Sequence, residues 1–183
     1  MKLLVSIGGA SGSIYGIRLL EELVNAGVEV HLIVSEGGKN IMAHETEITY
    51  DSLQDMVHSS YENNDLFAPP ASGSYPLDGM VIIPCSMKTL ASVAHGFGDT
   101  LTSRAASCQL KEGKPLILVV RETPLDIPGL SNMLQARQSG AVILPAMPGF
   151  YHKPQGIDDL VNFIVGKVMD QLHIPHSLFQ RWG

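Results

Sequence analysis

Five short, largely apolar runs recur along the chain, and none of them sustains an alternation with polar residues over its whole length. The runs are Leu3–Ile7, Val28–Val34, Met80–Pro84, Pro115–Val120 and Ala141–Leu144. Runs of this kind are typical of strands that are covered on both faces, as in a parallel sheet. The pattern therefore predicts a set of buried parallel strands.

Segments with helical periodicity separate these runs. In Ser13–Asn25, apolar residues recur at spacings of three and four, and Gly27 follows as a residue that ends helices. Near the carboxyl end, apolar residues recur at every fourth position over Leu160–Leu172. The alternation predicts a single α/β domain over residues 1–183, with a three-layer, doubly wound, mostly parallel sheet of the Rossmann or flavodoxin type. The polar segment Thr46–Pro76 has no clear period, and we expect a helix and a covering loop there.

The composition limits the kinds of molecule with which this protein can interact. The formal net charge is -6, and no run of Lys or Arg supplies the basic face that a nucleic-acid binder needs. Two cysteines are too few for a disulfide framework. No apolar run reaches the length of about 18 residues that a membrane span requires, and the first apolar run is too short for the core of a signal peptide. We expect a soluble, cytoplasmic protein without nucleic-acid or membrane partners.

Candidate chemistry gathers where the predicted strands end, which is where ligands bind in open α/β sheets. After the first strand, Gly8–Gly12 leads into a helix, so its backbone N–H groups can bind a phosphate; a tight turn that needs small residues explains it equally well. It matches neither the dinucleotide fingerprint nor the P-loop. Ser35 and Ser86–Thr89 add hydroxyls at two further strand ends, as phosphate ligands or as ordinary helix caps. Together with Arg121 they favour a phosphorylated ligand of mononucleotide size.

Charged residues give a second set of candidates. Arg104 and Lys111 are two helical turns apart and so share a face, either as a solvated row or as ligands of a highly charged anion. Lys167 lies in an apolar stretch, where it could snorkel to the helix edge. Arg121 and Glu122 follow a buried strand, so they must lie in a cleft or form a salt bridge.

Metal and thiol chemistry find no support in these patterns. The seven histidines show no metal-ligand spacing, and His44–Glu45 does not extend to a zinc-protease motif. Cys85 has no evident His or Asp partner, which favours a buried thiol over a nucleophile. The residues alone therefore predict an anion-binding α/β enzyme without a metal.

A series of short motifs runs along the chain in a characteristic order. They are Gly9–Gly12 with Tyr15–Gly16, Ala43–Thr46, Ala68–Ser74, Pro84–Ser86 with Thr89–Leu90, Arg104–Ala106, Leu110–Glu112, Arg121–Pro124, Asn132–Leu134, Gly140–Ala146, Pro148–His152 and Arg181–Gly183. In this order the chain resembles the flavin prenyltransferases of the UbiX type, which are related to the flavin-containing cysteine decarboxylases. Thr100 and Ser107 depart from the family pattern, at positions where we expect a cap or packing contact.

The resemblance implies a reaction. In this family, reduced FMN receives a dimethylallyl group from dimethylallyl monophosphate, at N5 and then at C6 of the flavin. The product, prenylated FMN, is used by a partner decarboxylase of the UbiD type, and no metal is required. The family forms homododecamers in which neighbouring protomers complete each site, and we expect the same assembly here.

The resemblance also implies roles for individual residues. The residues expected to bind FMN are Gly9, Ala10, Ser11, Ser35, Ser86, Met87, Lys88, Thr89 and Arg121. Those expected to bind dimethylallyl phosphate are Tyr151 and Lys167, with Arg104, Lys111, Arg121 and Glu122 around its phosphate. Glu45 is expected near N5 of the flavin, and Trp182 can add a wall to the pocket. Glu122 is a candidate proton shuttle, although the released phosphate could also serve as the base.

Two other functions remain open. One is an FMN-dependent decarboxylase, acting on an aromatic acid or a peptidyl cysteine; against the second, Pro70–Ser74 lacks the Asn found in cysteine decarboxylases. The other is a flavodoxin-like FMN carrier, which has no need of Arg104, Lys111, Glu122 and Lys167. The cations do not distinguish a monophosphate donor from a diphosphate.

Overall fold

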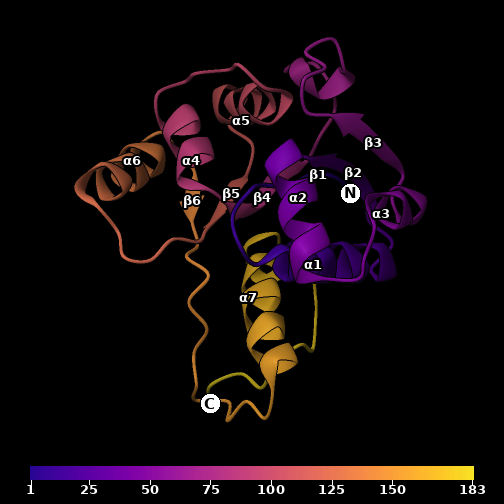
Figure 1. Cartoon of the computed structure of the whole chain (residues 1–183), viewed down its shortest axis with the longest axis vertical. Helices are drawn as coiled ribbons and strands as arrows, with labels where there is room; N and C mark the ends of the chain where they lie inside the picture. Colours follow the sequence, from indigo (N-terminus) through magenta and orange to yellow (C-terminus); the bar gives the residue numbers. More distant parts are fainter.

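The computed structural model describes residues 1–183 and contains one six-stranded sheet in which every strand pair is parallel (Figure 1). The strands are β1 (Lys2–Ile7), β2 (Glu29–Val34), β3 (Ser59–Glu62), β4 (Gly79–Cys85), β5 (Leu116–Val120) and β6 (Val142–Ile143). Their order across the sheet is β3-β2-β1-β4-β5-β6. This is the Rossmann order, so the predicted doubly wound α/β fold is confirmed, with an entirely parallel sheet.

Helices cover both faces of the sheet. They are α1 (Ser13–Asn25), α2 (Glu36–Glu45), α3 (Tyr50–Met56), α4 (Met87–Ala94), α5 (Leu101–Lys111), α6 (Ile127–Gln138), α7 (Ile157–Gln171) and the short 3-10 helix η1 (Pro69–Ala71). One hydrophobic core joins the sheet to α1 and α7, and a second joins it to α4 and α5 (Figure 1). All seven residues of β4 are buried, which explains why its sequence shows no polar alternation.

Helix α1 begins and ends where the periodicity predicts. Gly27, just beyond its end, has a positive φ of 73°, a conformation that glycine adopts without strain. Within the helix, a Cβ added to Gly16 would lie 2.6 Å from the carbonyl oxygen of Ile83. Glycine at this position therefore allows α1 to pack directly on β4.

The polar segment Thr46–Pro76 contains more structure than its sequence indicates. The expected helix is present as α3, but the segment also contains the edge strand β3, which the hydrophobic pattern does not predict. Strand β3 pairs only with β2, so its short polar sequence escapes the pattern of a buried strand. At the other edge, β6 has two residues instead of the predicted run Ala141–Leu144.

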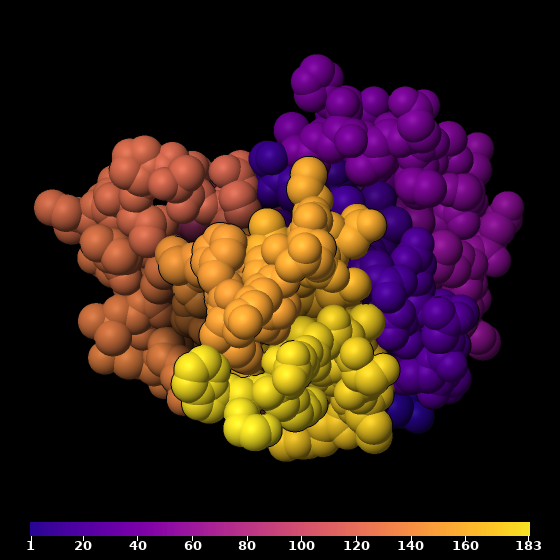
Figure 2. Space-filling view, turned by 90° about the horizontal axis from the view of Figure 1, so that it is seen from below, coloured from indigo at the N-terminus to yellow at the C-terminus, as the bar shows by residue number.

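The chain ends on the same side of the sheet as α7. After α7 the chain folds back, and Figure 2 shows the carboxyl-terminal residues, in yellow, packed beside the orange part of the chain. None of the helices is both long enough and apolar enough to span a lipid bilayer.

Candidate functional site

A polar cavity of about 340 Å³ lies beyond the carboxyl ends of β1, β2 and β4. Strand β1 lies between β2 and β4, and its crossover helices diverge there, which is the switch point where α/β proteins bind ligands. None of the residues that line the cavity is hydrophobic. They are Ser6, Gly8, Gly9, Ser35, Glu36, Gly37, Asn63, Ser86, Lys88, Thr89, Ser92, Asp99, Thr100, Thr102 and Ser103.

The glycine loop after β1 is held close to two other loops. The N–H of Gly8 donates a hydrogen bond of 3.1 Å to the carbonyl oxygen of Pro84, and a Cβ on Gly8 would lie 2.6 Å from that oxygen. A Cβ on Gly9 would lie 3.1 Å from the Cα of Gly37. The loop is thus both a tight turn and a wall of the cavity, and small residues are required for both.

Three helices begin beside the cavity, and each has a hydroxyl cap. Ser35 Oγ accepts from the N–H of Gly38 at 3.0 Å, and Ser86 Oγ accepts from that of Thr89 at 3.3 Å. Thr100 forms a capping box with Ser103 at the start of α5, which agrees with the cap expected at Thr100. These hydroxyls are helix caps, as the alternative interpretation holds, and they also line the cavity. The positive ends of three helices therefore face one space, which suits a phosphate.

Three polar residues that line the cavity, Ser6, Asn63 and Thr102, were not identified from sequence. Ser6 Oγ lies 2.8 Å from Thr102 Oγ1, which donates a hydrogen bond of 2.7 Å to Asn63 Oδ1. Ser6 stands inside a buried strand and Asn63 follows the unpredicted strand β3, so neither carries a sequence signal. Glu36 and Asp99 add carboxylates to the same cavity. Carboxylate and amide oxygens accept from hydroxyl groups, so the cavity suits a polyol next to the phosphate.

Arg121 links the end of β5 to the glycine loop. Its Nε donates a hydrogen bond of 3.0 Å to the carbonyl oxygen of Ser11. Glu122 accepts from the N–H of Thr123 at 3.0 Å and forms no ion pair with Arg121. Neither residue forms an ion pair with any other side chain, so the alternative of an intramolecular salt bridge at this edge of the sheet is wrong. Glu122 also lines a cavity of about 360 Å³ together with Met87.

Glu45, at the end of α2, caps the amino terminus of α1. Its carboxylate accepts from the N–H of Gly12 at 2.9 Å, from the N–H of Ser13 at 3.0 Å and from the hydroxyl of Ser13 at 2.6 Å. Burial opposes its ionisation, but hydrogen bonds from Ser11, Ser13 and the backbone outweigh burial and lower the pKa of Glu45. An ionised Glu45 thus holds the glycine loop at the start of α1.

Arg104 and Lys111 share one side of α5, as their spacing predicts, and both approach the segment that contains η1. Arg104 Nε donates a hydrogen bond of 3.0 Å to the carbonyl oxygen of Ala71. Lys111 Nζ lies 3.8 Å from Glu112 Oε1, and a Cβ on Gly73 would lie 2.8 Å from Lys111 Cε.

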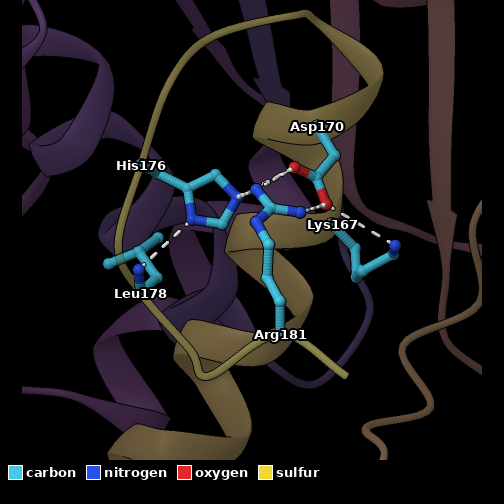
Figure 3. A network of polar contacts seen from close by, with 5 residues as sticks. All are labelled: Lys167, Asp170, His176, Leu178 and Arg181. Carbon is cyan, nitrogen blue, oxygen red and sulfur yellow. Dashed lines mark hydrogen bonds and ion pairs between the residues drawn. The ribbon is translucent and has the colours of Figure 1, made fainter. Parts of the chain in front are cut away.

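Tyr151 and Lys167 lie together near the carboxyl-terminal residues. The ring of Tyr151 makes an edge contact with that of Trp182, with centroids 5.4 Å apart. Lys167 Nζ lies 3.5 Å from Asp170 Oδ2, and both terminal nitrogens of Arg181 donate to the same carboxylate (Figure 3). Hydrogen bonds from Arg181 and then from His176 lower the pKa of Asp170, although burial opposes them. Lys167 is therefore a paired lysine, and its partner Asp170 was not identified from sequence.

The candidate residues thus form separate groups within one chain. The glycine loop, Ser35, Ser86, Lys88 and Thr89 surround the polar cavity, and Arg121 adjoins it through Ser11. Ala10 in the same loop is buried. Arg104 and Lys111 belong to the side of η1, and Tyr151 and Lys167 belong to the carboxyl-terminal side; no hydrogen bond or ion pair joins these two groups.

Cys85 is fully buried at the end of β4, and burial raises the pKa of its thiol to about 12. A thiol with so high a pKa is protonated at neutral pH and is a poor nucleophile. The interpretation of Cys85 as a buried structural residue is consistent with this environment.

The Rossmann strand order and the polar cavity at its switch point define a mononucleotide-binding α/β protein. Comparison with known proteins narrows this class. The family model described as Flavoprotein matches residues 1–169. The flavin prenyltransferase UbiX of Salmonella typhimurium is 48% identical over 184 residues, which cover 99% of this chain and 97% of the relative.

Solved structures agree. The crystal structure of AnUbiX (PadA1) in complex with FMN and dimethylallyl pyrophosphate is 40% identical, with a TM-score of 0.98 over 100% of this chain and 97% of that one. A dodecameric FMN-dependent UbiX-like decarboxylase from Escherichia coli O157:H7 is 41% identical, with a TM-score of 0.97 over 100% of both chains. The chain therefore belongs to the flavoprotein family and, within it, to the UbiX flavin prenyltransferases.

The residues around the polar cavity fit an FMN molecule. Its phosphate suits the three helix starts, and its ribityl hydroxyls suit the oxygens of Asn63, Asp99 and Glu36. No aliphatic or aromatic side chain lines the cavity, so it offers a flavin ring no hydrophobic residue to pack against.

The carboxylate cap on α1 predicts that the stability of the fold depends on pH. At neutral pH, Glu45→Gln removes a charged acceptor from the start of α1, and we expect it to lower the free energy of unfolding by about 1 kcal/mol. Because folding lowers the pKa of Glu45 below its ordinary value of 4.5, the stabilisation is complete above that value and is lost as the pH falls through the lowered pKa.

Melting temperatures measured at fixed protein concentration, from neutral pH down to about pH 3, test this. The difference between the wild type and Glu45→Gln should shrink in acid, while Glu47→Gln, an exposed change two residues away, should match the wild type throughout. A constant difference across the pH range would show that the charge of Glu45 plays no part.

Proposed function

We propose that this chain transfers a dimethylallyl group from dimethylallyl monophosphate to reduced FMN and so makes prenylated FMN. The observation that carries the proposal is the combination of a polar mononucleotide cavity with four cations and a tyrosine outside it, in a chain of the UbiX family. The cations and the tyrosine are Arg104, Lys111, Arg121, Lys167 and Tyr151. An FMN carrier needs the cavity alone.

The groups around the polar cavity would bind and orient the flavin. The N–H groups at the starts of α2 and α4, with the hydroxyls of Ser35, Ser86 and Thr89, would hold its phosphate. Arg121, fixed by its hydrogen bond to Ser11, would lie beside the ring. When bound and reduced, the flavin supplies the nucleophilic positions N5 and C6 that accept the allyl group.

Arg104, Lys111 and Lys167 would stabilise the phosphate that leaves when the allylic C–O bond breaks. Fixed cations aimed at a developing negative charge stabilise it more than water does, because they need no reorientation during the reaction. Arg104 is already fixed by the carbonyl oxygen of Ala71, and Lys167 by the carboxylate of Asp170.

Tyr151 and Trp182 would protect the allylic carbon from water. A carbon that develops positive charge is stabilised by the face of an aromatic ring, and water at the same place would capture it. Both rings are exposed in the isolated chain, at 42% and 81%. This exposure leaves them free to contact a substrate or a neighbouring protomer.

Assembly of protomers would bring the separate groups together. Arg104 and Lys111 lie on the η1 side of the chain, and Tyr151 and Lys167 lie on the carboxyl-terminal side, so a site that uses both groups would be built from two chains. A homododecamer, the state named for the E. coli relative, would supply such a junction. The product would serve a decarboxylase of the UbiD type.

The competing function is an FMN-dependent decarboxylase, the activity named for the same E. coli structure. The deciding experiment is anaerobic incubation with reduced FMN and either dimethylallyl monophosphate or diphosphate, followed by mass spectrometry of the extracted flavin. We expect a flavin with one added C5 unit from at least one of the two donors. An unmodified flavin with both donors contradicts prenyl transfer, and release of CO₂ from an aromatic acid or a peptidyl cysteine would establish the decarboxylase.

Glu122 is the proposed proton shuttle during closure of the new ring. Glu122→Gln keeps the size of the side chain and removes its base, so we expect unchanged FMN affinity and product formation slower by about 100-fold. Fluorescence titration of FMN and single-turnover absorbance separate the two effects. Glu21→Gln, in α1 at a residue paired with Arg18, is the matched control. Turnover equal to that of the control would remove Glu122 from the mechanism and leave the released phosphate as the base.

A shared site predicts complementation between two inactive variants. We expect Lys111→Ala and Tyr151→Ala each to abolish turnover. If the two side chains reach one site from different protomers, random mixed assemblies contain intact sites at roughly a quarter of positions. Co-expression with separate affinity tags, followed by an activity assay of doubly purified assemblies, tests this. Mixed assemblies without activity would place Lys111 and Tyr151 in sites built by a single protomer.

A further inference from the structure

A second cluster of polar side chains lies at the opposite end of the sheet from the flavin cavity. Glu29 begins β2, His31 follows two residues later, and His58 directly precedes β3. Residues two apart on a strand point to the same face, which places Glu29 and His31 together. Because the cavity lies beyond the carboxyl ends of the strands, this cluster belongs to a separate part of the molecule.

The three side chains direct one ligand atom each toward a common point. His31 Nε2 lies 3.1 Å from Glu29 Oε1, and His58 Nε2 lies 3.6 Å from the same oxygen. All three atoms lie within 4.8 Å of one another. Ligand atoms around a tetrahedral zinc ion, with bonds near 2.1 Å, are about 3.4 Å apart. Small rotations of exposed side chains would therefore bring these atoms into coordination geometry.

The neighbouring residues hold His31 ready for a ligand. His31 is 1% exposed, and its Nδ1 is hydrogen-bonded to the hydroxyl of Tyr61 at 3.0 Å, which leaves Nε2 toward Glu29. Metal-binding histidines are characteristically oriented by such a bond from the other ring nitrogen. The N–H of His58 donates to the carbonyl oxygen of Val30 at 3.0 Å, so the backbone of the third residue is fixed as well.

Lys2 occupies the position that a cation would take. Its Nζ lies 2.8 Å from Glu29 Oε1, and hydrogen bonds from Lys2 and then His31 lower the pKa of Glu29 to about 2, so this carboxylate is ionised at neutral pH. The ring of Tyr75, with its centroid 5.2 Å from Nζ, offers the ammonium group a second partner. The ammonium group of Lys2 therefore competes with any metal for Glu29.

We propose that Glu29, His31 and His58 form a binding site for one divalent transition-metal ion such as Zn²⁺, with a fourth position open to water. Two imidazole nitrogens and one carboxylate oxygen are a donor set that selects Zn²⁺ and its neighbours over Mg²⁺ or Ca²⁺. The ion would join the start of β2 to the edge strand β3 and stabilise the fold by mass action. The site is independent of the proposed prenyl transfer.

The test uses the full-length assembled protein, stripped of metal with a chelator and titrated with Zn²⁺ by calorimetry. We expect one ion per protomer. His58→Ala changes an exposed residue, and Glu29→Gln keeps the size of its side chain; each should weaken Zn²⁺ affinity by about tenfold or more while circular dichroism stays unchanged. His95→Ala, which removes another exposed histidine, should leave the affinity unchanged. Absence of stoichiometric binding, or equal affinity in all three variants, overturns the proposal.

We expect Lys2→Met to change the Zn²⁺ affinity in the opposite direction. Removal of the competing ammonium group should tighten Zn²⁺ binding, whereas Lys39→Met, which breaks the similar ion pair of Lys39 with Glu62, should have no effect. Unchanged affinity in Lys2→Met would show that Glu29 does not bind the metal, and the proposal would fail.

The wild type also allows a measurement that needs no variant, because Co²⁺ in a four-coordinate site absorbs visible light strongly. The weak absorption of six-coordinate Co²⁺ would contradict the proposed ligand set.

Discussion

The close approach of the loops around β1 determines the rest of the candidate site. All strands run the same way, so every loop that follows a strand emerges at one edge of the sheet, and the central position of β1 places its loop between two others. The bond between Gly8 and Pro84 and the contact between Gly9 and Gly37 leave no room for side chains. Larger residues there would push the starts of the helices apart, and a nucleotide phosphate could then not contact them at the same time.

Much of this arrangement follows from the sequence by simple physical rules. Buried parallel strands must be apolar on both faces, so the four central strands and α1 could be located by pattern alone. Ser35 and Ser86 could be recognised because they follow such strands directly. Edge strand β3 could not be located in this way. It pairs with one neighbour only, so its residues need not be apolar and its polar sequence carries no strand pattern. Asn63 and Thr102 were missed for the same reason, because the contact between them depends on where β3 ends.

The reaction could not be inferred from hydrophobic patterns and strand ends in this way. Composition and spacing indicated an anion-binding enzyme, and only the ordered series of motifs, now supported by relatives nearly half identical, identified a flavin as prenyl acceptor. The histidines illustrate the limit of spacing arguments. His31 and His58 are far apart in sequence, and the pairing of His31 with Ser59 brings them together through strand register. Register between neighbouring strands is a tertiary property that a ligand-spacing rule does not contain.

Asp170 lies between two cations from different segments of the chain, Lys167 in α7 and Arg181 near the carboxyl terminus. One carboxylate binds the guanidinium of Arg181 and the ammonium of Lys167, so the two cations draw on the same negative charge (Figure 3). Loss of the contact with Arg181 would leave this carboxylate to Lys167 and His176 alone, so the position of the last residues bears on how tightly the lysine is held.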